Sequence, residues 1–288
     1  MKQIRWIAPM LLAFSAGALA QPESMSPWQF EAYAVSGGDG DVERGGEVSE
    51  QQFGASVGYR YNLGRGRMAG VNVAVDKRQW DFADLRLGNG ALASLDSRNS
   101  YQVSAFAMQP LSRDWMLLVS PSVEWAYADG ASASDGMNYS VVAMANYGGI
   151  EHLKLGVGLA YINGVVEVKT MPFISFDWQI NDRWRLSNPF EAGFNGRAGV
   201  ELSYQYSDNI NLGFGGGFRT DQFAYQDGAI EEELPLSFAR ASYQLQSGQT
   251  VSLIAGLRNA GDITVHNAGS EVDYEVDSRW LMGLMVNF

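Results

Sequence analysis

The last fifteen residues of the chain alternate between apolar and polar side chains with the period of two that is typical of a β-strand. One face of the segment 274–288 is almost entirely apolar, and the segment ends on that face at an aromatic residue. The apolar positions are Tyr274, Val276, Trp280, Met282, Leu284, Val286 and Phe288. Such a face must be covered along its whole length, so the segment predicts a sheet that either packs on a core or faces lipid.

The first residues of the chain predict export. Two basic residues open the sequence, an apolar stretch follows from 7 to 19, and small side chains precede a cleavage site before Gln21. We therefore expect residues 1–20 to be a cleaved signal peptide and 21–288 to form a single domain. A single-pass anchor is the alternative, but the stretch is shorter than the roughly 20 apolar residues that a spanning helix needs.

Composition narrows the class of protein further. The sequence contains no cysteine, which excludes a lipoprotein anchor, disulfides, thiolate metal sites and a thiol nucleophile. Its formal net charge of −12 disfavours a nucleic-acid partner, because phosphate binding needs a basic face. Hydrophobic residues make up 46% of the chain, yet the mean hydropathy is −0.14. Apolar residues that alternate with polar or small ones give this cancellation.

Alternating segments of about ten residues recur along the chain, as tilted transmembrane strands require. The segments are 28–36, 51–62, 71–78, 101–107, 115–125, 139–147, 153–161, 166–180, 184–186, 198–206, 210–214, 239–245, 251–257 and 274–288. They predict fourteen strands, or twelve if the stretch from 184 to 195 is a loop. Trp115 and Trp125 fall at the two ends of one segment, where they would mark opposite interfacial girdles.

The connections between these segments alternate in length. Short, turn-like connections are 62–66, 110–114, 148–152, 181–182, 207–209 and 247–248. The intervening connections are longer, apart from a tight turn at 163–164: they are 37–50, 80–97, 127–137, 187–196, 220–233 and 259–273. Short periplasmic turns that alternate with longer outer loops are typical of outer-membrane barrels.

We therefore expect an all-β protein that forms a closed antiparallel transmembrane β-barrel. A soluble antiparallel sandwich is the alternative for alternating strands alone. In lipid, however, backbone polar groups cannot stay unpaired, so an exported sheet with an apolar outer face is expected to close. 

The whole pattern resembles Gram-negative outer-membrane β-barrel proteins, in size the monomeric fourteen-stranded porins, or a barrel family without assigned function. The terminal aromatic residue Phe288 resembles the signature that the barrel-assembly machinery recognises in such proteins. The resemblance implies a location in the outer membrane of a Gram-negative bacterium, in contact with its lipid and lipopolysaccharide. It leaves the oligomeric state open.

Charged side chains at the inward positions suggest what the lumen does. The residues predicted to line it are Arg60, Asp76, Arg78, Glu124, Lys154, Glu167, Lys169, Asp177, Arg197, Glu201, Arg219, Arg258 and Arg279. Glycines interspersed with them are expected to leave space: Gly156, Gly158, Gly199, Gly213, Gly215 and Gly217. A charged lumen at fourteen strands suits a water-filled path for small polar solutes. The alternative is a closed barrel in which these charges pair as a filled lattice and acidic surface loops engage partners.

Two features of the outer connections allow several interpretations. Four leucines, Leu85, Leu87, Leu92 and Leu95, make the connection 80–97 unusually apolar, so that it either folds into the pore or packs on its neighbours. Acidic clusters occupy other connections: Asp39, Asp41, Glu43, Glu47 and Glu50; Asp227, Glu231, Glu232 and Glu233; Glu271 and Asp273. They lack the spacing of a calcium loop, so a solvated surface is expected.

A lipid-acting hydrolase is the enzymatic alternative. Outer-membrane phospholipases and lipid A deacylases place a histidine two residues before a serine, and neither His152 nor His266 is followed by one at that spacing. We therefore expect no catalytic residue, no metal site and no cofactor.

Overall fold

The fold comes from a computed structural model of the chain, which describes residues 26–43, 46–83, 95–128, 130–188, 198–226, 228–267 and 270–288. Within these ranges the chain forms sixteen strands and belongs entirely to one sheet. No helix in the described part is long and apolar enough to cross a membrane. The predicted signal peptide lies outside the described residues and stays a prediction.

The strands follow the sequence-predicted segments closely. They are β1 (Trp28–Asp41), β2 (Glu47–Gly64), β3 (Arg67–Ala83), β4 (Ser97–Pro110), β5 (Trp115–Ala128), β6 (Met137–Ile150), β7 (Leu153–Asn163), β8 (Val168–Gln179), β9 (Trp184–Asn188), β10 (Ala198–Ser207), β11 (Ile210–Tyr225), β12 (Gly228–Gln244), β13 (Thr250–Arg258), β14 (Gly261–Asn267), β15 (Ser270–Val276) and β16 (Arg279–Asn287).

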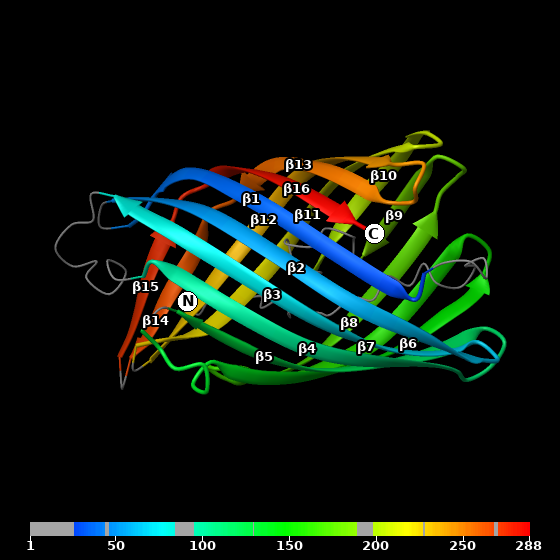
Figure 1. The fold of residues 1–288 in the computed structure, drawn as a ribbon, viewed down its shortest axis with the longest axis horizontal. Helices are drawn as coiled ribbons and strands as arrows, with labels where there is room; N and C mark the ends of the chain where they lie inside the picture. The colour runs from blue at the N-terminus through cyan, green and yellow to red at the C-terminus, as the bar shows by residue number, and fades with distance from the viewer. Residues whose placement is uncertain are drawn as a thin grey trace, which may run out of the picture.

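Fourteen of these strands close into an antiparallel barrel (Figure 1). Neighbours in sequence pair from β1 through to β13, and β16 then pairs with both β13 and β1. The short strand β9 is one of the fourteen, because it pairs with β8 and with β10. The prediction of fourteen strands is therefore confirmed. The hairpin of β14 and β15 is an addition to the barrel, not part of the ring.

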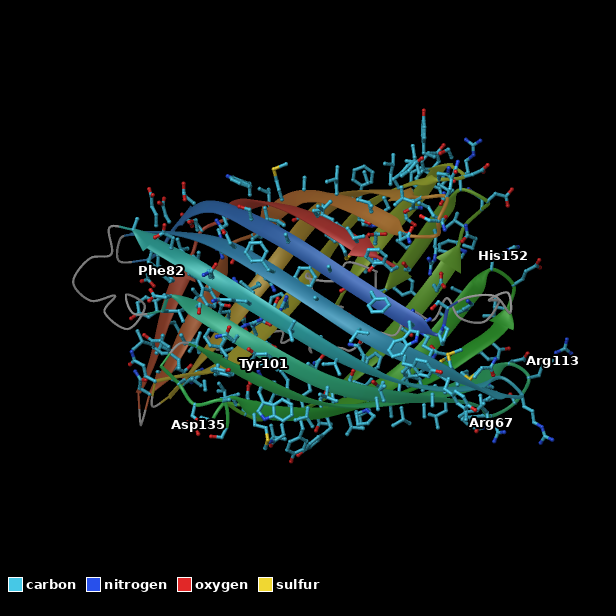
Figure 2. All side chains as sticks on the ribbon, viewed as in Figure 1. Arg67, Phe82, Tyr101, Arg113, Asp135 and His152 are labelled. Carbon is cyan, nitrogen blue, oxygen red and sulfur yellow. The ribbon has the colours of Figure 1, made fainter. Side chains whose placement is uncertain are left out.

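The outer surface of the barrel carries a belt of exposed apolar side chains. Tyr101, labelled in Figure 2, is one of them. Val73, Leu155 and Leu284 are 45%, 38% and 44% exposed, although each lies within a strand of the barrel. A soluble sandwich would bury these side chains, whereas a barrel in lipid presents them to acyl chains. The soluble alternative is therefore wrong.

Aromatic pairs mark both edges of the belt. Trp115 and Tyr147 lie near the short turns, with ring centroids 5.1 Å apart. Tyr101 and Tyr127 stack near the other end, at 6.3 Å. Beyond that end the outward positions turn polar, as at Lys77 on β3. The strands therefore continue past the outer membrane–water boundary.

The outer connections are long, as predicted, but much of their length is strand instead of loop. β1 and β2 extend into the predicted loop 37–50, β11 and β12 use nearly all of 220–233, and β14 and β15 form within 259–276. In these segments many side chains on both faces of the strand are polar. The difference in hydropathy between the two faces, which predicted the other strands, is therefore small. The prediction of one strand over 274–288 is wrong: Tyr274 and Val276 belong to β15 and are buried, whereas β16 forms from the rest of the segment. Three of the leucines of the connection 80–97 lie outside the described residues; Leu95 is buried.

The outer strand ends close into a second, smaller ring, which we call the outer cap. It contains nine strands, namely β1 to β5, β11, β12, β14 and β15. Two contacts complete it. Tyr127 of β5 pairs with Ala224 of β11, although six steps separate these strands around the barrel, and Val42 pairs with Val276 at the end of β15. The remaining strands, β6 to β10, β13 and β16, are absent from the described part of this ring.

The interior of the outer cap is filled with apolar side chains. The buried cluster comprises Val42, Val48, Trp80, Leu95, Ala126, Ala128, Phe223, Tyr225, Ile230, Ile263, Val265, Tyr274 and Val276. Trp80 of β3 stacks on Phe223 of β11 across the ring, with centroids 5.7 Å apart. Such a core stabilises the smaller ring by removing apolar surface from water. Because the core fills the ring, it also closes the barrel at this end.

The apolar belt generates a prediction for the mutation Val73→Arg. Because Val73 lies mid-belt, we expect arginine there to destabilise the folded protein, lowering its free energy of unfolding in lipid by about 2–4 kcal/mol. Gln79→Arg is the matched control, since Gln79 is exposed on the same strand beyond the belt, and it should cost little. Urea titration of both variants in phospholipid vesicles measures the difference; equal costs would contradict the position of the belt.

Candidate functional site

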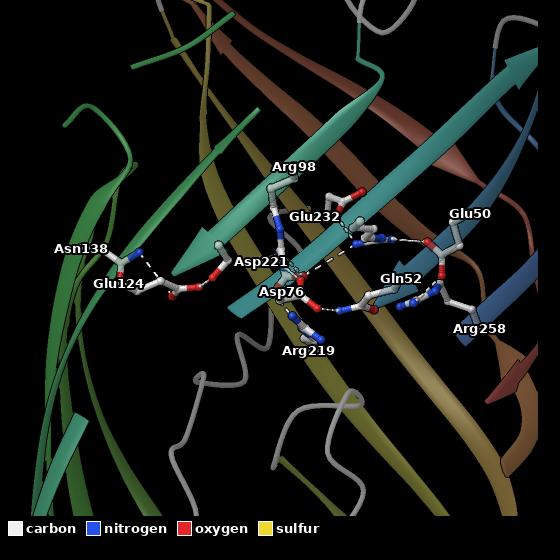
Figure 3. A network of polar contacts seen from close by, with 12 residues as sticks. Glu50, Gln52, Asp76, Arg98, Glu124, Asn138, Arg219, Asp221, Glu232 and Arg258 are labelled. Atoms are coloured by element: carbon white, nitrogen blue, oxygen red, sulfur yellow. Dashed lines mark hydrogen bonds and ion pairs between the residues drawn. The ribbon is translucent and has the colours of Figure 1, made fainter. Parts of the chain in front are cut away.

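A layer of ion pairs lies directly beneath the apolar core of the outer cap (Figure 3). Reading inward-facing positions down β3 gives Trp80 in the core and then Arg78 and Asp76 in this layer. β11 gives the same order, from Phe223 in the core to Asp221 in the layer. The ionic layer therefore separates the cap core from the lumen below.

Glu50 on β2 is the centre of one half of the layer. Its carboxylate accepts hydrogen bonds from Arg78 at 2.9 Å and from Arg279 at 3.1 Å, and it also pairs with Arg258. Arg78 in turn pairs with Glu232 on β12, which lies on the far side of the cap. These contacts tie the wall formed by β2, β3, β13 and β16 to the strands β11 and β12.

Asp221 on β11 is the centre of the other half. It accepts hydrogen bonds from Arg98 at 2.8 Å and from Arg219 at 2.7 Å. Arg98 also pairs with Asp76, which accepts further hydrogen bonds from Tyr33 at 2.6 Å and from Gln52 at 2.8 Å. The carboxylates in both halves are shared among several donors.

The ionic layer is almost inaccessible to solvent. Arg78, Arg98 and Asp221 are each 1% exposed, and Glu232 is 0% exposed. Charges taken out of water at this depth are tolerated only when paired and hydrogen-bonded. Arg78 lies 4.8 Å from the ring centroid of Trp80, so the layer also packs on the apolar core. The same guanidinium faces three carboxylates, those of Glu50, Asp221 and Glu232.

The predicted lumen residues divide by depth. Arg78, Glu124, Glu201, Arg258 and Arg279 are buried; Asp76, Lys169 and Arg219 are nearly so; Arg60, Lys154 and Asp177 are partly buried; Glu167 is half exposed; and Arg197 lies outside the described residues. The structure brings Asp76, Arg78, Arg219, Arg258 and Arg279 together in the ionic layer. That any of them lines a solute path stays a prediction.

Several charged partners in the interior were missed by sequence reasoning. Glu50, Asp221 and Glu232 belong to the ionic layer but fall in segments predicted as outer loops. Arg185 and Arg240 lie between outward-facing neighbours on β9 and β12, so the same alternation could have identified them.

The expectation that the acidic clusters form solvated surface is wrong for some of their members. Glu50 is 2% exposed and Glu232 is 0% exposed. Glu231 lies 3.4 Å from the ammonium nitrogen of Lys169. Asp39, Glu43 and other members remain exposed on the outside of the cap. A strand places alternate acids on opposite faces, which explains why one run of acidic residues divides in this way.

Below the ionic layer the wall carries hydroxyls and a second set of ion pairs. Arg240 donates to Glu201 at 3.1 Å and to Asn211 at 3.0 Å. Nearer the short turns, Arg185 binds Asp177 through two hydrogen bonds of 2.7 and 3.1 Å. The side chains of Arg185 and Asp177 are 37% and 21% exposed. Solvent therefore reaches this end of the interior.

The sequence suggested that inward-facing glycines leave open space in the lumen. The structure shows instead that side chains of neighbouring residues fill this space. A Cβ added at Gly158 would lie 2.2 Å from the ring of Phe173, and one at Gly215 would lie 2.6 Å from Phe238. In both cases the ring belongs to the residue directly opposite on the next strand. The same arrangement holds at Gly54 with Tyr33 and at Gly70 with Phe106. The rings consequently lie against the wall and do not project across the lumen.

The two histidines lie on different elements of the fold. His152 lies in the turn before β7, 3.3 Å from Glu151, and both side chains are well exposed. His266 is part of β14, opposite Ala229 of β12, not in a loop as predicted. Among the described residues, no cluster of three or more histidine or acidic side chains could hold a metal ion.

Comparison with known sequences places the chain in a family. Residues 96–247, more than half of the chain, match the family model described as a domain of unknown function (DUF6268). The chain belongs to the DUF6268 family. The match begins beside the start of β4 and ends just after β12, so it includes both partners of the Tyr127–Ala224 contact. No curated protein matches the sequence.

Solved structures agree with the DUF6268 protein in fold. A deltaS2 mutant of the TodX monoaromatic hydrocarbon channel superposes with a TM-score of 0.51 at 9% identity, over 92% of this chain and 90% of that one. An outer membrane channel from Pseudomonas putida F1 gives 0.49 at 9% identity, over 93% and 100%. The NanC porin gives 0.41 at 8% identity, over 90% and 98%. The TodX likeness, at 9% identity, supports the shared barrel fold alone.

The ionic layer generates a prediction for Glu50→Gln. The substitution removes the carboxylate that three buried arginines share, so we expect it to destabilise the protein by about 3–5 kcal/mol. Glu47→Gln is the control, because Glu47 is exposed on the same strand, and it should change stability by less than about 0.5 kcal/mol. Denaturant unfolding in vesicles measures both. Similar stabilities for the two variants would show that the layer is not tightly paired.

Proposed function

We propose that this DUF6268 protein is a passive channel for small polar solutes in the outer membrane of a Gram-negative bacterium. The observation that carries the proposal is the gradient of exposure among inward-facing charges. Lys154, Asp177 and Arg185 near the short turns are 38%, 21% and 37% exposed, whereas Arg78 beneath the cap is 1% exposed. Water thus enters the polar interior from one end.

The chemistry of the wall favours polar solutes. Paired serines such as Ser122 with Ser140, at 2.8 Å, lie at inward positions below the ionic layer. Arg240 and Glu201 add a charged pair on the same wall. Hydrogen-bonding and charged groups of this kind set the selectivity of a pore. A hydrocarbon, the solute for which the TodX channel is named, would not satisfy these groups, and a sequence identity of 9% does not transfer a substrate from that protein to this one.

A closed barrel is the second candidate, and the filled outer cap favours it. In that case the ion pairs would only hold the barrel in shape, and the exposed acids of the cap would meet external partners. Both candidates involve the same membrane setting: lipid and lipopolysaccharide around the belt and the barrel-assembly machinery acting on the C-terminal strand. An enzyme is not proposed, since neither histidine has a nucleophile at the required spacing.

Conductance in planar bilayers tests the channel. We expect the refolded protein to give stepwise currents, and Arg185→Glu to raise the ratio of cation to anion permeability by about twofold or more, because the reversal places a carboxylate at an accessible point of the lumen. Arg183→Glu is the matched control. Arg183 lies two residues away in the turn and donates to the outward-facing Tyr204 at 3.1 Å, so the ratio should stay unchanged.

Two results would contradict the channel. Silence of the wild-type protein and of both variants over a range of voltages and pH would favour the closed barrel. Currents whose ion preference responds equally to Arg183→Glu and Arg185→Glu would show that the ions do not follow the proposed lumen.

A further inference from the structure

The outer cap sets a problem for any solute that crosses the barrel. Its thirteen-residue apolar cluster and the ionic layer beneath occupy the axis at the outer end. A polar solute cannot pass such a core without disrupting it, since polar groups are costly to place among apolar ones. The cap, however, includes only nine strands of the sheet, while the lumen below is enclosed by fourteen. Part of the barrel rim is therefore left beside the cap.

The rim formed by β6 to β10 contacts the outside of the cap. The turn between β7 and β8 touches the face of β11 and β12 that points away from the cap core. The backbone N–H of Val166 donates to Gln222 at 3.4 Å, and Lys169 lies 3.4 Å from Glu231 and 2.7 Å from Glu167. β8 and β11 are three steps apart around the barrel, so these contacts bridge over the outer ends of β9 and β10. We call this contact the side rim.

The side rim is held far more weakly than the cap. Its contacts are polar, and its charged side chains are 11% exposed at Lys169, 12% at Glu231 and 51% at Glu167. Of its two ion pairs, the one between Lys169 and the half-exposed Glu167 has access to water, and such pairs contribute in general up to about 1 kcal/mol. The cap, by contrast, has a stacked aromatic pair and a buried core on the other face of the same strands. Opening at the rim disturbs few contacts.

We propose that solutes leave the barrel sideways, beneath the cap, through the side rim, and that the Lys169–Glu231 pair closes this route. The inference rests on the proposed channel and assigns its outer mouth. Exposure rises outwards within the side rim, since Lys169 and Glu231 are nearly buried and Glu167 is half exposed. Charged side chains of both signs line it, so the mouth suits small hydrophilic or zwitterionic solutes more than apolar ones.

Site-directed labelling tests the location of the mouth, because the chain has no cysteine of its own. Glu167→Cys places a thiol at the side rim. Asp96→Cys places one on the exposed neighbour of Leu95, beside the cap core. A bulky methanethiosulfonate reagent added to the outer side of the bilayer should reduce the current of Glu167→Cys by about twofold or more. The current of Asp96→Cys should be unchanged.

A charge exchange tests the closing pair separately. Lys169→Glu sets a third carboxylate against Glu167 and Glu231, so the open probability should rise by about threefold or more, given the like-charge repulsion. Restoring attraction in the double variant Lys169→Glu with Glu231→Lys should return it towards the wild-type value. Lys77→Glu, at an exposed position on the outside of β3, is the matched control and should have no effect.

The outcomes separate this inference from the channel itself. A protein that carries no current in any variant contradicts the proposed function, and the side mouth with it. Currents that are blocked through Asp96→Cys, or through neither cysteine, contradict the side mouth alone. An open probability that does not respond to Lys169→Glu contradicts the role of the Lys169–Glu231 pair.

Discussion

The requirement that every backbone polar group in lipid be paired is the constraint on which the rest of this structure depends. The sheet meets it by joining β16 to β1, so that the belt around the barrel has no free edge. Above the lipid the requirement weakens, since water can satisfy backbone groups. There the same sheet closes a second time through Tyr127 and Ala224, with fewer strands and a solid core. One sheet thus changes from a wide ring to a narrow one where the solvent changes.

The narrow ring explains why so many charges lie in the interior. Where β11 and β12 turn in towards β3, β4 and β5, side chains from opposite walls come close enough to form ion pairs, as Arg78 and Glu232 do. Replacing such pairs by apolar residues is often neutral in energy, whereas leaving one partner alone is costly. The ion pairs therefore specify how the two walls meet, while the apolar core beside them supplies much of the stability.

The sequence predicted the part of the fold that lipid contact determines. Alternation of apolar with polar residues identified all fourteen strands of the barrel, including the short β9, and the outward direction of Val73, Leu155 and Leu284. It missed the cap, because residues such as Glu50 and Asp221 alternate among other polar residues and give no contrast in hydropathy. The contact of β5 with β11 joins positions almost a hundred residues apart, and local periodicity carries no information about it. The same limit applies to the ionic layer, whose partners come from six or more strands.

Disulfide trapping across the narrow ring tests the central claim most directly. In the cysteine-free chain, Tyr127→Cys and Ala224→Cys replace the two residues that pair between β5 and β11. The account predicts that the folded double variant forms an intramolecular disulfide on oxidation, detected as a mobility shift that reductant reverses, while Tyr127→Cys paired with Trp280→Cys does not. Absence of the disulfide, when each single cysteine is present and reacts with a thiol reagent, would show that β11 does not reach β5 and that the barrel is open along its axis.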